Sequence, residues 1–270
     1  MSDSISFDRV ADRYDETRGY SDEVARRIAE GIIREGRLQP GAHLIELGIG
    51  TGRIALPLLT RGIHITGVDI SAEMMSQLKR RLDAWDAQNP GKARGTLTLR
   101  AEDMTQLPFP DGAFDGVIAV HVFHLVPKWE RALDEALRVL RPGAPFLLGQ
   151  DASQQDAPIY HIQDIWVSIM LELEHPVVYA GARSRAQVIE ALRQRGRAPV
   201  EKVIATWDKV HTPRQVLSLV GDQIWSRTWD VPDDVFRESV RDLTEIVYAE
   251  YGDQMDTPQS SPFEFRLTRA

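Results

Sequence analysis

Short apolar runs alternate with amphipathic segments between about residue 40 and residue 150 of the chain. The apolar runs are typical of buried strands, and the segments with apolar residues three or four positions apart are typical of helices. The predicted strands cover residues 42–47, 63–69, 96–100, 114–122 and 144–150, and the predicted helices cover 52–60, 72–85 and 129–140. Strands and helices in alternation predict a parallel sheet covered by helices on both faces.

Two helices are predicted before this core. The first runs from Phe7 to Asp15, and the second follows Ser21, which has the side chain of an N-cap residue. Val24, Ile28 and Ile32 fall on one face of the second helix. We therefore expect residues 1–40 to form an N-terminal helical cap over the first strands.

The pattern changes after Asp151. Helical segments recur four times, and alternating apolar and polar residues mark a final edge strand. The predicted elements are helices around 162–173, 184–195, 213–227 and 236–251 and strands at 200–207 and 262–268. We interpret residues 1–270 as one α/β domain with a core at 41–151, in which helical insertions at 152–183 and 212–260 form a substrate lid.

A glycine-rich loop follows the first predicted strand. Residues 44–52 read Leu-Ile-Glu-Leu-Gly-Ile-Gly-Thr-Gly, with an acid at Glu46 and glycines at Gly48, Gly50 and Gly52. Glycine permits a backbone turn with positive φ and lets a ligand approach closely, and the first N–H groups of the next helix are free to bind it. This pattern predicts a nucleotide-type binding site.

The spacing of these glycines disfavours NAD. The dinucleotide fingerprint G-x-G-x-x-G, placed on Gly48 and Gly50, needs a third glycine where this chain has Arg53. The Tyr-x-x-x-Lys pair of many nicotinamide-dependent oxidoreductases is also absent. A NAD-dependent oxidoreductase is therefore the weaker alternative.

Acids stand at the ends of the next two strands. Asp69 ends the second strand, where a carboxylate accepts hydrogen bonds from both hydroxyls of a ribose. Asp103 follows the third strand and is placed to accept from the amino group of adenine. We include their neighbours Ile70 and Met104 in the candidate cofactor site.

These motifs resemble those of the class I S-adenosylmethionine-dependent methyltransferases. The resemblance continues in Leu-Pro-Phe-Pro-Asp-Gly-Ala-Phe-Asp at 107–115 and Arg-Val-Leu-Arg-Pro-Gly at 138–143, and it covers residues 7 to 151 closely. The chain looks most like the group that includes ubiquinone, menaquinone and many small-molecule methyltransferases. The resemblance implies a Rossmann-like, seven-stranded, mostly parallel sheet with an antiparallel last strand. It also implies S-adenosyl-L-methionine as cofactor and a lid segment containing Tyr14.

Methyl transfer from a sulfonium requires no protein nucleophile, because the acceptor attacks directly while the protein aligns the reactants and excludes water. An acceptor that must lose a proton needs a base. His124, where related enzymes often carry a histidine, and His121 are the candidate catalytic residues. Either is open to a structural role instead, and a metal site with Asp151 is a weaker alternative, so we expect no metal.

Composition removes several classes of function. The chain has no cysteine, which excludes disulfide-built domains, zinc–thiolate sites, C5-cytosine methylation and radical S-adenosylmethionine chemistry. A formal charge of −8 disfavours a nucleic-acid partner. Neither a signal peptide nor a membrane span is visible, so we expect a cytoplasmic protein.

The acceptor is expected to be a small apolar or aromatic molecule. Trp166, Trp225 and Trp229, with Trp207 nearby in sequence, either line a water-poor acceptor pocket or pack the inserted helices. An S-adenosylmethionine-binding protein without turnover remains the alternative to a methyltransferase.

Overall fold

The computed structural model describes residues 4–11, 14, 18–153 and 157–270 of the chain. It divides into two compact units. The first unit comprises Met1–Gln150, Ala180–Ala205 and Phe265–Ala270, and the second comprises Asp151–Tyr179 and Thr206–Glu264. Each unit is described by itself below.

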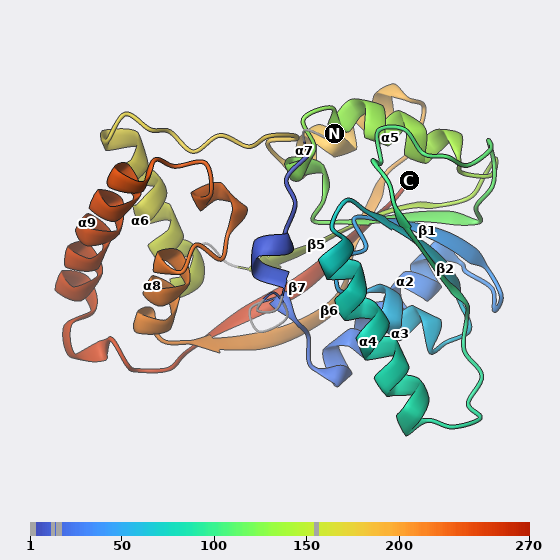
Figure 1. Cartoon of the computed structure of the whole chain (residues 1–270), viewed down its shortest axis with the longest axis horizontal. Coiled ribbons are helices and arrows are strands. Elements are labelled where there is room, and N and C mark those ends of the chain that lie inside the picture. The colour runs from blue at the N-terminus through green and yellow to red at the C-terminus, as the bar shows by residue number, and fades with distance from the viewer. Residues whose placement is uncertain (1–3, 12–13, 15–17, 154–156) are drawn as a thin grey trace. The chain divides into compact units, whose positions relative to one another are not determined.

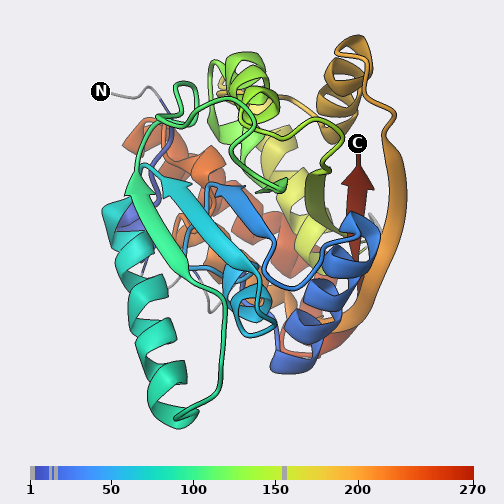
Figure 2. The same ribbon diagram turned by 90° about the vertical axis from the view of Figure 1, so that its right-hand side faces the viewer.

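The strands form one seven-stranded sheet in the order β3-β2-β1-β4-β5-β7-β6, with six parallel strands and an antiparallel β7. Their bounds are β1 (His43–Leu47), β2 (His64–Asp69), β3 (Leu97–Ala101), β4 (Gly116–Val120), β5 (Phe146–Ser153), β6 (Val200–His211) and β7 (Gln259–Arg269). Figure 2 shows β3, β2 and β1 side by side. The predicted fold class is confirmed, including the antiparallel last strand.

The register of the parallel strands brings their carboxyl ends to one edge. Leu47 of β1 pairs with Val68 of β2 and with Ala119 of β4, and Asp69 pairs with Ala101 of β3. The sheet order reverses between β1 and β4, because β2 and β3 lie on one side of β1 and the later strands on the other. Ligands of such sheets bind beyond the carboxyl ends at this reversal.

Helices of the first unit connect these strands, and some of them begin at hydrogen-bonded caps. The Ser21 side chain accepts from the backbone N–H of Val24, and Ser71 accepts from that of Met74. The helical elements are η1 (Asp8–Val10), α2 (Asp22–Gly36), α3 (Ala55–Leu59), α4 (Ala72–Gln88), η2 (Phe123–Leu125), α5 (Trp129–Arg138) and α7 (Arg185–Gln194).

Helices α6, α8 and α9 of the second unit pack on one another (Figure 1). Their shared apolar core includes Ile162, Trp166, Val216, Leu243 and Val247, all at most 1% exposed. The elements of this unit outside the sheet are α6 (Pro158–Glu172), α8 (Pro213–Gly221), η3 (Ser226–Thr228), α9 (Asp233–Tyr251) and η4 (Gly252–Gln254). The periodicity of the sequence correctly indicated helices in these segments.

Two predicted elements end earlier in the structure. The helix predicted over 213–227 ends at Gly221, because Gln223 adopts φ 51°, and only the short η3 follows. The fourth strand was predicted to reach residue 122 but ends at Val120, because His121 adopts φ 51°, which is incompatible with a strand. Within the predicted helix 7–15, Asp8–Val10 form η1, Ala11 and Tyr14 are helical, and residues 12, 13 and 15 lie outside the described residues.

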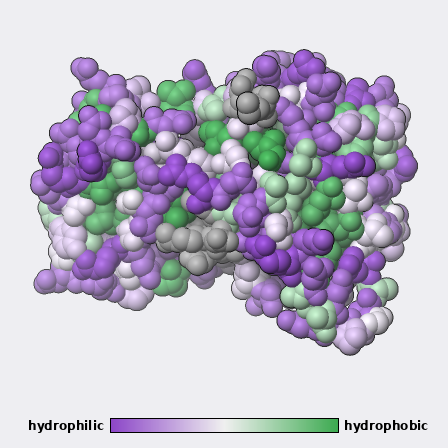
Figure 3. Space-filling model, in the orientation of Figure 1, coloured by the Kyte–Doolittle hydropathy of each residue, from purple (hydrophilic) through white to green (hydrophobic). Residues whose placement is uncertain are grey.

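The face of the molecule drawn in Figure 3 is mostly hydrophilic, with apolar residues in separate small patches. Among the described helices, none combines the length and the apolar composition needed to cross a membrane.

Candidate functional site

The glycine loop begins directly after β1 and has a backbone that only glycine fits. Gly48 adopts φ 65° and Gly52 adopts φ 74°. A Cβ at Gly48 would lie 2.5 Å from Cγ2 of Val122, and one at Gly52 would lie 2.2 Å from Cδ1 of Leu78. Both conformation and space therefore exclude a side chain at these positions.

Asp69, at the end of β2, holds this loop in place. Its Oδ2 accepts a hydrogen bond of 2.8 Å from the backbone N–H of Gly50, and its Oδ1 accepts one of 2.8 Å from that of Ser71. Burial raises the pKa of Asp69, and these backbone hydrogen bonds oppose the rise. Because a carboxylate oxygen has two lone pairs, each oxygen retains capacity for a hydroxyl donor. The predicted contact with a ribose stays a prediction.

Glu46 lies in the middle of the sheet, on β1, with 3% of its surface exposed. Among the described residues, none donates a hydrogen bond to its buried Oε2. Burial raises the pKa of Glu46 to about 8, Arg53 acts to lower it, and Asp69 acts to raise it. An unsatisfied buried oxygen costs stability unless a ligand supplies a donor. The oxygen fits the amino group of an amino-acid ligand.

Arg53 occupies the position at which the dinucleotide fingerprint has glycine. Its guanidinium carbon lies 4.9 Å from the centre of the Tyr20 ring, and its Nη1 donates a 3.0 Å hydrogen bond to the carbonyl oxygen of Arg18. Arg53 is 8% exposed. It therefore attaches the segment before α2 to the glycine loop, a role that a glycine cannot have.

The N-terminal segment crosses the carboxyl end of β1. The backbone N–H of Ile5 donates to the carbonyl oxygen of Leu125, beyond β4, at 3.1 Å. Asp8 accepts a 2.5 Å hydrogen bond from the Ser71 hydroxyl, beyond β2, and this bond is the main cause that lowers the pKa of Asp8. Since β1 lies between β2 and β4, residues 5–8 span the end that carries the glycine loop.

Tyr14 is placed by an aromatic contact. Its ring lies edge-on to that of Phe7, with ring centres 5.6 Å apart. This contact attaches Tyr14 to the N-terminal segment, and the role of Tyr14 toward the cofactor stays a prediction.

The residues after β3 reach the same edge. Asp103 forms a turn in which its Oδ1 accepts from the backbone N–H of Thr105 at 2.8 Å. Met104 is 6% exposed, and its Cε lies 3.9 Å from the position of a Cβ on Gly48. Ile70 is partly exposed beside Asp69. The structure thus brings Met104 to the glycine loop, whereas an adenine contact of Asp103 and Ile70 stays a prediction.

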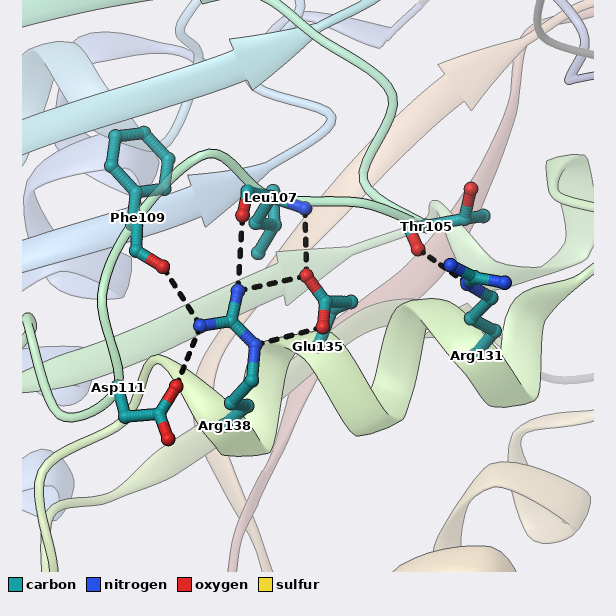
Figure 4. Close-up of polar contacts among 7 residues, drawn as sticks. All are labelled: Thr105, Leu107, Phe109, Asp111, Arg131, Glu135 and Arg138. Carbon is teal, nitrogen blue, oxygen red and sulfur yellow. Dashed lines mark hydrogen bonds and ion pairs between the residues drawn. The ribbon is translucent and has the colours of Figure 1, made fainter.

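Arg138 on α5 holds the loop after β3 in place (Figure 4). This residue was not identified as part of the site from the sequence. Arg138 donates to the carbonyl oxygens of Leu107 and Phe109 and to the carboxylate of Asp111. Glu135 binds Arg138 through both oxygens and accepts from the backbone N–H of Leu107 at 2.8 Å. Asp111 and Arg138 belong to the two motifs, at 107–115 and 138–143, that carry the family resemblance. The presence of both motifs in the sequence was therefore the available signal for a contact between them.

The candidate histidines follow β4. His121 has a left-handed backbone, and such strained residues cluster at functional sites. Val122 faces Gly48, and His124 lies one residue further, in η2, where its carbonyl oxygen accepts from the backbone N–H of Gly181 at 3.0 Å. The segment therefore passes beside the glycine loop. Catalysis by either histidine stays a prediction.

Metal ligands do not cluster in the part of the chain that the structure describes. No group of three or more histidine, aspartate or glutamate side chains is arranged there to hold an ion. The weaker hypothesis of a metal site formed with Asp151 gains no support.

Comparison with curated proteins identifies relatives of this core. Residues 45–148 match the family described as a methyltransferase domain. Phosphatidylethanolamine N-methyltransferase of Cereibacter sphaeroides is 31% identical over 123 residues, which are 46% of this chain and 57% of that protein. Demethylmenaquinone methyltransferase of Beutenbergia cavernae is 30% identical over 169 residues, 61% of this chain and 64% of that protein. The chain thus covers less than two thirds of the length of each.

Solved structures share the fold at low identity. A protein of Anabaena variabilis, described as a methyltransferase of an antibiotic biosynthesis pathway, is 17% identical with a TM-score of 0.57, and the match covers 90% of this chain and 98% of that one. A Bacillus halodurans protein described as a methyltransferase is 14% identical with a TM-score of 0.56, covering 89% and 96%. Residues 45–148, which contain the glycine loop, Asp69 and the loop after β3, are thus similar to a methyltransferase domain.

Proposed function

We propose that this chain transfers a methyl group from S-adenosylmethionine to a small apolar or aromatic acceptor. The observation that carries the proposal is the buried Oε2 of Glu46, on the strand that leads into the glycine loop, to which none of the described residues donates a hydrogen bond. A ligand with a cationic amino group supplies the missing donor. S-adenosylmethionine has such a group on its methionine portion.

The remaining site residues fit the other parts of this cofactor. The glycine loop leaves room for the methionine portion, and Asp69 would accept from the ribose hydroxyls. Asp103, Met104 and Ile70 would contact the adenine. Residues 5–8, which cross the end of β1, would limit the access of water to the bound cofactor.

The bound cofactor supplies a methyl group activated by the positive sulfur. The chain must align the acceptor with that methyl and keep water out. If the acceptor is a phenol, an alcohol or a carbon acid, His124 would take its proton, with His121 as the second candidate.

Three observations support a small-molecule acceptor. The two curated relatives are named for phosphatidylethanolamine and demethylmenaquinone, which are small molecules. The net charge of −8 gives no general attraction to nucleic acid. Helices α6, α8 and α9 add a separate apolar unit to the methyltransferase core, and we propose that these insertions supply the acceptor lid.

The tryptophans of the insertions fit a role in packing the inserted helices better than a role in lining an acceptor pocket. Trp166 is 1% exposed, and its Nε1 donates to the Ser239 hydroxyl at 3.0 Å. Trp225 belongs to the same core, and Nε1 of Trp229 donates to the carbonyl oxygen of Gln223. These side chains stabilise the helices, so an acceptor pocket would need other residues.

Two measurements test the proposal. S-adenosylmethionine and S-adenosylhomocysteine at about 100 times their Kd should each raise the melting temperature by several degrees, and NAD should not. Cell extract incubated with the protein and methyl-labelled S-adenosylmethionine should then yield a labelled metabolite by mass spectrometry. Equal shifts with NAD would refute the cofactor site. Binding without any labelled product would support the non-catalytic alternative.

A further inference from the structure

Strand β6 stands at one edge of the sheet, with β7 as its neighbour in the sheet order. An edge strand presents unpaired backbone N–H and C=O groups along its outer side. Val200, Val203 and Val210 on this strand are 56%, 48% and 58% exposed. Such a long strand with exposed valines can accept a further strand.

We propose that β6 pairs antiparallel with β6 of a second copy of this chain, with Ala205 opposite Ala205 of that copy. In this register Glu201 stands opposite Lys209, Lys202 opposite Asp208, and Val200 opposite Val210. Two-fold symmetry repeats each pair. Formation of this dimer is separate from the proposed methyl transfer.

The charges select this register over its neighbours. A slip of one residue in either direction places like charges opposite each other, either Lys202 and Lys209 or Glu201 and Asp208. A slip of two residues places these charged side chains opposite uncharged residues or His211. Opposite charges facing each other across antiparallel strands stabilise the pairing, and like charges destabilise it. The strand sequence is thus self-complementary in one register.

Contacts within one copy are compatible with this pairing. Nζ of Lys202 lies 2.6 Å from a Glu35 oxygen, and Glu201 forms an ion pair with Arg185. An ammonium group has three donors and a carboxylate accepts about four hydrogen bonds, so both retain capacity for a partner across the strands. Nζ of Lys209 lies over the Phe263 ring, 5.0 Å from its centre.

Charge reversal tests the register in the full-length chain. Sedimentation equilibrium should show a dimer of the wild type that weakens as salt is added. Lys202→Glu should weaken the dimer by about 10-fold or more, because both copies then place like charges opposite each other. The double variant Lys202→Glu with Asp208→Lys restores opposite charges and should recover dimerisation. Glu35→Gln, which weakens the contacts of Glu35 with Lys202 and with Arg34 within one copy, should leave dimerisation unchanged.

Cross-linking gives a second readout, because the wild-type chain has no cysteine. A mixture of Lys202→Cys and Asp208→Cys proteins should form a disulfide-linked dimer under mild oxidation, whereas either protein alone should not, because its cysteines would be too far apart to bond. A monomeric wild type at low salt would overturn the proposal. So would a Lys202→Glu variant that dimerises normally, failure of the double reversal to recover dimerisation, or cross-linking that is equal in the single proteins.

Discussion

Both units bury an apolar cluster, and they differ in the polar groups that they bury beside it. At the glycine loop, the first unit buries the ionisable side chains of Glu46 and Arg53. In the second unit, α6, α8 and α9 enclose the buried Trp166, whose N–H is satisfied by Ser239. Burying a charged group without full pairing costs stability, whereas burying apolar surface contributes it. The buried ionisable groups of the glycine loop therefore cost stability unless a ligand pairs with them, whereas the buried groups of the second unit contribute stability.

This contrast indicates that ligand binding and stability are separable by mutation. Changes at the strand ends of the first unit should alter cofactor affinity or turnover. Changes in the apolar core of the second unit should alter stability alone. The following variants test this separation.

The largest effect is expected at His124. If its imidazole takes the proton of the acceptor, His124→Gln should lower turnover by about 10²- to 10⁴-fold. The affinity for S-adenosylhomocysteine, measured by calorimetry, should change little. Near-normal turnover on the identified acceptor would assign catalysis to alignment alone and leave His124 a structural role.

Trp166→Ala tests the core of the second unit. Truncating a buried tryptophan should cost about 3–5 kcal/mol of unfolding free energy, and here it also leaves the Ser239 hydroxyl without this donor. Urea denaturation measures the loss, and Trp166→Phe should cost less. A parallel fall in S-adenosylhomocysteine affinity at a temperature where the variant is folded would contradict the separation of the two units.

Gly52→Ala tests the glycine loop. The added methyl would overlap Cδ1 of Leu78, so we expect a loss of roughly 2–4 kcal/mol of stability and of the melting-temperature rise with S-adenosylmethionine. Gly62→Ala is the matched control, because Gly62 also has positive φ but has open space around its Cβ position. If both variants bind the cofactor equally well, the crowding at Gly52 is irrelevant to binding.

Asp69 combines two roles in the structure, so its replacement should have two effects. Asp69→Ala should weaken cofactor binding by roughly 1.5–3 kcal/mol and lower stability, because the Gly50 and Ser71 N–H groups lose their acceptor. Asp69→Asn retains one acceptor oxygen and should be milder in stability. Unchanged cofactor affinity in a destabilised Asp69→Ala protein would make the residue purely structural.

The smallest effect, taken per pH unit, concerns pH. Because burial raises the pKa of Glu46 from 4.5 to about 8, the folded state holds a proton that the unfolded state has released between these values. Stability should therefore fall as pH rises from about 4.5 to about 8, by up to about 1.4 kcal/mol per pH unit from this group. Glu46→Gln should flatten that slope in denaturation curves measured at several pH values. An unchanged slope would show that Glu46 ionises normally.

The local patterns of the sequence determined much of the fold. Short apolar runs located the core strands, period 2 located the last strand, and period 3.6 located most helices, because these patterns report which faces of an element are buried. Gly48 and Gly52 signalled a positive-φ loop, since glycine adopts that backbone without steric cost. The order of acids after successive strands placed Glu46 and Asp69 at one edge, because parallel strands share their carboxyl ends.

Only the tertiary structure decided the contacts between distant residues. The bond from Gly50 to Asp69, the Arg138 network on the loop after β3 and the bridge from Asp8 to Ser71 join residues far apart in the chain. The left-handed backbone at His121, which ends β4 early, has no signal in the periodicity. Periodicity reports which side of an element is apolar, whereas hydrogen-bond partners depend on how the elements are packed, and that information lies in no single stretch of the sequence.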